Sequence, residues 1–154
     1  MDATYTATEK LTSQSSIDKK ILNFAVRLWF VIATLGQWMF AYYVIAFYGR
    51  ATATGNIEKW NEVLPHGYVA GDLAGNLVVG IHLLFAAIII ICGPLQIIPQ
   101  IRNYVPTFHR FSGRLYIFTA IILSLSGLIM VWTRGSVGGM TQHISISINA
   151  ILII

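Results

Sequence analysis

The chain has 154 residues, of which 56% are hydrophobic and only 10% are charged, with a formal net charge of +4 and a mean hydropathy of +0.69. Soluble domains carry about 25% charged residues, so the composition excludes an ordinary soluble fold and indicates that lipid is the solvent. The positive charge does not indicate a nucleic-acid partner, because the basic residues lie mostly at the ends of apolar runs, where membrane topology accounts for them.

The N-terminal segment is polar. Residues 1–20 are rich in Thr and Ser and lack the apolar centre of a signal peptide. We interpret residues 1–18 as a mobile cytoplasmic tail and residues 19–154 as one membrane domain.

Three apolar segments have the length of a membrane span, or nearly so, at about 21–48, 76–98 and 115–132; about 20 residues are needed. A fourth run, 143–154, covers roughly 18 Å of a hydrocarbon core about 30 Å thick. It predicts either half of an interrupted span or a truncated chain, and we favour truncation. The predicted fold class is all-α, a polytopic transmembrane helical bundle with three full spans and a partial fourth, because backbone groups in lipid must be paired within helices.

The basic residues set the expected orientation. With the N-terminus in the cytoplasm, seven basic residues lie inside and three outside, as the positive-inside rule requires. The inner set is Lys10, Lys19, Lys20, Arg27, Arg102, Arg110 and Arg114, and the outer set is Arg50, Lys59 and Arg134.

The outer connection, 49–75, contains the segment NIEKWNEVL. Its residues Ile57, Trp60 and Leu64 fall on one side of a helix, and Pro65 ends it. This pattern predicts a short helix lying on the outer interface and anchored by Trp60.

Polar and small residues share one face of the second span, opposite an aliphatic face suited to lipid. They are Gly75, His82, Ala86, Gly93 and Gln96. His82 therefore points into the protein. It is either an axial haem ligand, a proton relay or part of a quinone or small-molecule pocket, or a neutral histidine bonded to a neighbouring helix. Pro94 predicts a kink, which either opens a pocket near Gln96 or only sets the packing.

A second histidine, His143, stands at the outer start of the fourth run, in the same leaflet as His82. Two histidines on different helices are the minimum for haem b. No C-x-x-C-H motif is present, and the single cysteine, Cys92, excludes a paired-cysteine metal motif. The sequence therefore predicts no cofactor outright and keeps haem b, held by His82 and His143, as an alternative.

The inner connection carries Arg102, His109, Arg110 and Arg114 close to the cytoplasmic head groups, with His109 just before an expected helix start at Ser112. Guanidinium groups bind phosphate in bidentate fashion, which predicts a lipid or anionic-substrate site. The alternative is that these residues only anchor the topology and attract anionic lipid.

The third span places small residues on one face: Gly113, Ala120, Ser124 and Gly127. Small residues at this spacing predict close packing against another helix.

Several segments resemble a known family: W-N-E-V-L-P-H-G-Y-V-A-G-D-L-A-G-N from Trp60, then H-L-L, G-P-L-Q-I-I-P and F-H-R-F-S-G-R-L-Y. They are similar to bacterial predicted membrane proteins of domain-of-unknown-function family 2306, from about Trp60 to the C-terminus. The resemblance implies a bacterial inner-membrane helical bundle without established activity, whose members continue beyond a fourth span. It also implies that the recurring polar positions are His82, Gln96, His109, Arg110, Gly113 and Arg114.

No nucleophile elbow, H-E-x-x-H motif or phosphate loop is present, so the sequence does not predict an enzyme. We expect a multi-pass membrane protein with a small-ligand site on the polar face around His82. The alternatives are a haem b-binding redox protein and a transporter or channel subunit, the latter suggested by the interruption at Gly93–Pro94.

Overall fold

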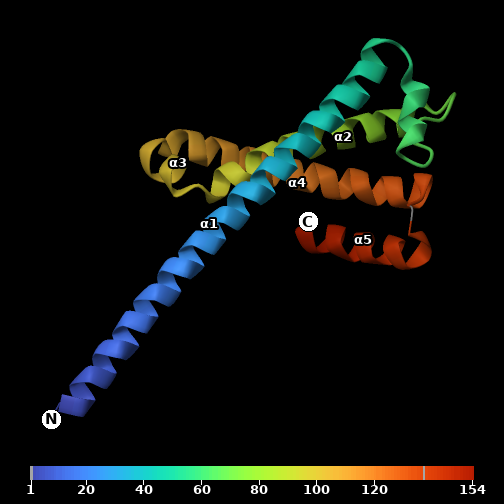
Figure 1. Ribbon diagram of the computed structural model, residues 1–154. Coiled ribbons are helices and arrows are strands. Elements are labelled where there is room, and N and C mark those ends of the chain that lie inside the picture. Colours follow the sequence, from blue (N-terminus) through green and yellow to red (C-terminus); the bar gives the residue numbers. More distant parts are fainter. Residues whose placement is uncertain (1, 137) are drawn as a thin grey trace. The chain divides into compact units, whose positions relative to one another are not determined.

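A computed structural model describes the backbone of residues 2–136 and 138–154 and the side chains from Ile17 onward, residue 137 excepted. Within these residues it is built of helices and contains no strand (Figure 1). The chain divides into two units, 1–36 and 37–154, and the first helix contributes to both. The elements are α1 (Asp2–Ala53), the 3₁₀ helix η1 (Ile57–Glu62), α2 (Leu73–Ile97), α3 (Pro99–Tyr104), α4 (Pro106–Arg134) and α5 (Gly139–Ile153).

Three of these helices are long and apolar enough to cross a membrane: Ile17–Ala53 within α1, α2 and α4. They confirm the predicted all-α fold with three full spans. α5 has 15 residues, about 22 Å at 1.5 Å each, and it begins at Gly139 rather than at His143. Residues 2–18 are helical; the mobility and membrane side expected of them stay predictions.

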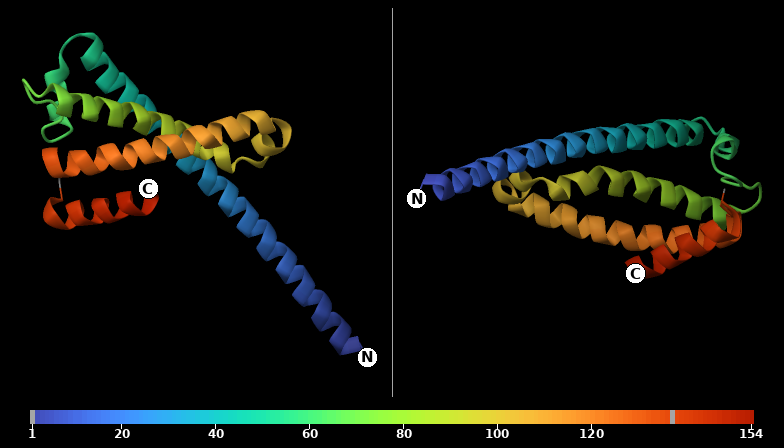
Figure 2. Two further views of the ribbon diagram at one scale, coloured as in Figure 1. Left: turned by 180° about the vertical axis from the view of Figure 1, so that it is seen from behind. Right: turned by 60° about the horizontal axis from the view of Figure 1, so that its bottom comes forward.

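In the unit 37–154, α4 lies between α2 and α5 (Figure 2). α4 packs along both neighbours, whereas α2 and α5 have no direct backbone contact, and α3 packs against α4 and α2. The residues 54–72 and the connection from α4 to α5 lie at one end of this unit, which we call the loop end. The other end carries α3.

The hydrophobic core of this unit lies at the loop end. Trp60 is 6% exposed and packs with Tyr48 and Val79, and the Tyr48 and Trp60 rings meet edge to face. The expectation that Trp60 anchors an interfacial helix is therefore wrong. The segment is a 3₁₀ helix, whose three-residue turn puts Ile57 and Trp60 on the same side, toward α1 and α2.

The connection between α2 and α4 is also more helical than expected. α3 fills most of it, and α4 begins at Pro106, so that His109 lies inside α4 and not before a helix start at Ser112. Both helices have proline in their first turn, where its missing N–H is no loss.

Candidate functional site

Two polar side chains tie α2 to α4. His82 Nδ1 lies 2.9 Å from Ser126 Oγ, and Gln96 Nε2 donates to Ser112 Oγ at 2.6 Å. Each serine in turn donates to the carbonyl four residues earlier on α4, Ser126 to Ile122 at 2.7 Å and Ser112 to Phe108 at 2.9 Å. The predicted inward direction of both α2 side chains is thus what the structure shows.

Both hydrogen bonds fit the same register of α2 against α4. His82 and Gln96 are fourteen residues apart, and so are Ser112 and Ser126, which is two heptads of an antiparallel helix pair. Each serine is followed by a glycine. A Cβ on Gly127 would lie 3.3 Å from His82 Cε1, and one on Gly113 would lie 3.1 Å from Gln96 Oε1, so these glycines give the two polar side chains room.

The serines belong to a repeat on α4 that our reading of the sequence missed. A hydroxyl residue followed by a small one recurs every seven residues, at Ser112–Gly113, Thr119–Ala120 and Ser126–Gly127. The three hydroxyl residues are buried, and Thr119 is fully inaccessible. The small-residue face predicted close packing correctly, but the partners of His82 and Gln96 were recognisable only from the seven-residue period.

A cavity of about 410 Å³ opens beside His82, between α2, α4 and α5. Its wall is mainly aliphatic, with four polar side chains set into it: His82, Tyr116, Ser124 and Asn149. This volume lies in the range of small-molecule sites, about 300–1,000 Å³, and the mixture of an apolar wall with a few polar groups is typical of them.

The polar side chains in the cavity have hydrogen-bonding atoms without a partner in the described part of the protein. Within residues 17–136 and 138–154, His82 bonds only through Nδ1, and neither the Ser124 hydroxyl nor the Asn149 amide makes a hydrogen bond. None of these atoms is among the fully enclosed ones without a partner, and Asn149 is an exposed residue. An unpaired amide in an apolar medium costs several kcal/mol. A ligand that forms hydrogen bonds with these groups would therefore be stabilised in the cavity.

A larger space of about 590 Å³ lies between the last turns of α1 and the middle of α2. Its wall is almost wholly apolar, and its Thr52 hydroxyl already donates to Tyr48 O. We place the candidate site in the smaller cavity because polar groups from three helices converge in it, whereas the wall of the larger space is almost wholly apolar.

The sequence did not predict that a cationic side chain, Arg134, is buried at the loop end. Arg134 is 7% exposed; its Nη2 pairs with Asp72 Oδ2 at 2.6 Å and with Asn76 Oδ1 at 3.1 Å, and its Nη1 donates to His66 O at 3.0 Å. His66, with φ 52°, returns a contact from Nδ1 to Arg134 O. This cluster fixes residues 66–76 to the end of α4, so Arg134 is a structural clamp as well as a flanking charge.

The predicted basic residues lie at the α3 end. Arg102, Arg110 and Arg114 are exposed, and Arg110 and Arg114 are one turn apart on α4. His109 is partly buried, and its Nδ1 finds no partner among the described residues. None of the four lines the cavity beside His82, so the structure separates them from it, as it does Gln96.

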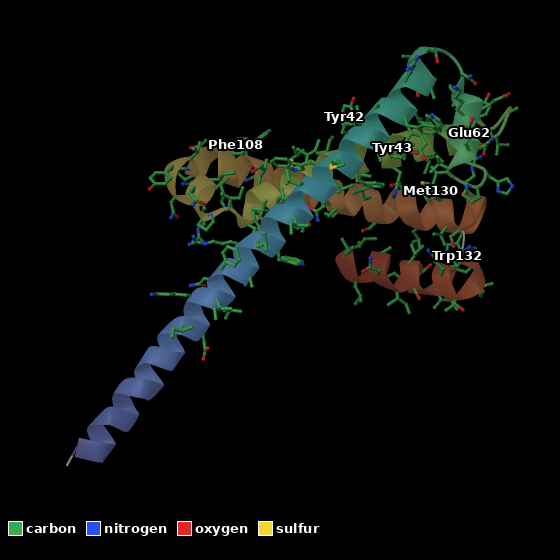
Figure 3. The ribbon with its side chains drawn as sticks, in the orientation of Figure 1. Tyr42, Tyr43, Glu62, Phe108, Met130 and Trp132 are labelled. Atoms are coloured by element: carbon green, nitrogen blue, oxygen red, sulfur yellow. The ribbon has the colours of Figure 1, made fainter. Side chains whose placement is uncertain are left out.

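His143 likewise lies outside that cavity. Its Nε2 accepts the backbone N–H of Ser136 at 3.0 Å, and its ring packs against Trp132. Trp132, which lies near the end of α4 (Figure 3), also donates to Ser147 on α5. The structure therefore does not bring His82 and His143 into one site. No group of three or more histidine, cysteine or acidic side chains suited to a metal occurs in the described part of the chain. Haem b stays a prediction.

Comparison with known proteins identifies the C-terminal half. Residues 79–154 match the family described as "Predicted membrane protein (DUF2306)". No curated protein and no solved structure matches the chain. The resemblance predicted from about Trp60 is confirmed from Val79 onward, and the matched range contains α4, α5 and the whole wall of the candidate cavity. Over residues 79–154, the chain therefore matches the DUF2306 family of predicted membrane proteins.

Proposed function

We propose that this membrane protein binds a small amphiphilic molecule in the cavity beside His82. The observation that supports the proposal is that polar groups from three helices line one cavity. They are His82 on α2, whose Nε2 has no partner among the described residues, and Ser124 on α4 and Asn149 on α5, whose side chains make no hydrogen bond there. A polar group in hydrocarbon is expensive unless it is paired, and such groups mark functional sites in membrane proteins.

The cavity suits a ligand that enters from the bilayer. Most of its wall is aliphatic, with Leu123, Ile146 and Ile153 among the lining side chains. An apolar body would replace lipid contact along this wall, and a polar head would pair with His82 or Asn149. This function uses binding and needs no catalytic group.

Photolabelling tests the proposal. The full chain in lipid nanodiscs is irradiated with para-octylphenol that carries a diazirine in its alkyl chain, and adducts are mapped by mass spectrometry. We expect adducts on Leu123, Ile146 and Ile153 that excess unlabelled para-octylphenol removes. Adducts spread evenly over the lipid-facing surface, with no competition, would refute a binding site.

A matched pair of variants separates the cavity from the surface. Ala120→Phe puts a ring into the cavity and should reduce the competed labelling at least about tenfold, as loss of roughly 1.4 kcal/mol of binding would. Ile121→Phe makes the same kind of change at a neighbouring, 38% exposed position that does not line the cavity, and labelling should persist.

We also propose that the protein lies in a bacterial inner membrane with its N-terminus and the α3 end in the cytoplasm. Arg134 is held by an ion pair, which leaves Arg50 and Lys59 as the exposed basic residues of the loop end. The excess of exposed basic residues on the cytoplasmic side is thus larger than the count of seven against three from the sequence. In a Cys92→Ser background, a cysteine placed at Thr54 should react with an impermeant thiol reagent in intact cells, and one at Thr107 should not; the reverse pattern would invert the topology.

The exposed arginines of the α3 end would then face the anionic inner leaflet. Arg102, Arg110 and Arg114 are each available to lipid phosphate. Replacing all three by Gln should reduce the phosphatidylglycerol retained by the purified protein, measured by native mass spectrometry. Unchanged retention would leave them without this role.

A further inference from the structure

The hydroxyl of Ser126 has a single hydrogen to donate. Ser126 Oγ lies 2.7 Å from Ile122 O and 3.2 Å from Leu123 O. Two oxygens approach to 2.7 Å only with a proton between them, so this hydrogen points to the α4 backbone. Ser126 has none left for His82, and toward His82 it is an acceptor.

The direction of that bond fixes the protonation of the His82 ring. His82 Nδ1 lies 2.9 Å from Ser126 Oγ, so Nδ1 carries the proton and donates. In a neutral imidazole the other nitrogen is then an acceptor. His82 lines the cavity, and its Nε2 lone pair has no protein partner within the described residues. The ligand must supply a donor at this point.

From this tautomer we infer that the ligand is a lipophilic alcohol or phenol, whose hydroxyl donates to His82 Nε2. The inference rests on the proposed function. A cationic ammonium head would also donate, but the described wall of the cavity holds no acidic side chain to balance its charge, and an unpaired charge at this depth is far more costly than a hydroxyl. The Asn149 amide, which both donates and accepts, complements the amphoteric oxygen of a hydroxyl.

Two probes of the same apolar shape test the donor. The first is the photoreactive para-octylphenol described above, and the second is its methyl ether, which has lost the hydroxyl hydrogen. At equal concentration in nanodiscs, the phenol should label the cavity residues about 3- to 10-fold more than the ether, as expected for one hydrogen bond. Equal labelling by both would overturn the inference while leaving a binding site in place. Failure of both to label the cavity would overturn the proposed function itself.

Variants locate the acceptor. His82→Phe keeps a flat ring but has no lone pair, and it should bring the phenol-to-ether ratio close to one. Gln96→Leu removes the equivalent α2–α4 tie outside the cavity, and the ratio should keep its wild-type value. A ratio preserved in His82→Phe would refute His82 as the acceptor.

Nitrogen NMR of the wild-type chain with isotope-labelled histidine gives a readout that needs no variant to fold. The His82 ring should show a protonated Nδ1 and an unprotonated Nε2, and only the Nε2 resonance should move markedly on addition of the phenol. A ring protonated at Nε2 would overturn the inference directly.

Discussion

A methyl group added at Gly75 should dismantle the Arg134 clamp. A Cβ at this position would overlap both Arg134 Nη2 and Asp72 Oδ2, the two atoms that form the ion pair. Gly75→Ala requires both atoms to move, and we expect the ion pair to open. We therefore expect a loss of stability from a substitution that usually favours a helix.

The magnitude follows from the burial of the two partners. Removing the partner of a fully buried charge costs about 3–5 kcal/mol. The Arg134 side chain is 5% exposed but that of Asp72 is 47% exposed, so solvent screening brings the expected cost to about 2 kcal/mol. The gain in helix propensity is at most about 1 kcal/mol. The net loss of about 1–2 kcal/mol corresponds to a fall in Tm of roughly 2–8 °C.

The single cysteine provides the assay. Cys92 is partly buried in α2, so its reaction with a thiol-activated dye during heating in detergent reports the opening of that helix. Gly80→Ala is the matched control, because its Cβ would meet Trp60 Cη2 at an ordinary 3.5 Å, and its Tm should hold or rise. Equal shifts for the two variants, or an Arg134→Met effect that is as large in the Gly75→Ala background as in the wild type, would refute the clamp.

Three further outcomes follow from the packing. Trp60→Ala should lower the stability by about 3–5 kcal/mol in the same thermal assay, since it empties a buried aromatic site; a loss under 1 kcal/mol would mean that Trp60 is not in the core. Ser126→Ala should cost about 1–3 kcal/mol by leaving His82 Nδ1–H unpaired, whereas Ser124→Ala, which breaks no protein hydrogen bond, should stay within about 0.5 kcal/mol. Asn149→Leu should raise the Tm in the absence of ligand, because it replaces an unpaired amide by an aliphatic group, and a lowered Tm would reveal a partner for Asn149.

The helices of this protein could be predicted from sequence because lipid imposes a simple requirement of length and apolarity. The same argument placed His82 and Gln96 on the inward face of α2, since the opposite face had to meet hydrocarbon. The argument from lipid failed at η1. Trp60 is a residue type typical of the membrane interface, but here it packs in the core against Tyr48 and Val79. Interfacial and buried tryptophans look alike in sequence.

The candidate site was only half predictable. His82 could be recognised as a polar residue in an apolar helix. Asn149 lies among isoleucines near the C-terminus and is part of no motif. That they share a cavity depends on α4 passing between α2 and α5, which no local pattern encodes. The Arg134–Asp72 pair joins residues 62 positions apart, and for the same reason Arg134 was predicted only as one of the outer basic residues.

The paired serine and glycine positions on α4 have a consequence for movement. If α2 slid along α4 by one heptad, His82 or Gln96 would face Thr119, which is followed by alanine rather than glycine, and Ile89 would be set against a serine. Only the observed alignment gives both α2 side chains a hydroxyl and free space, so these contacts fix the register of α2 against α4. α5 touches α4 but not α2. The α5 wall of the cavity beside His82 is therefore held in place through α4 alone.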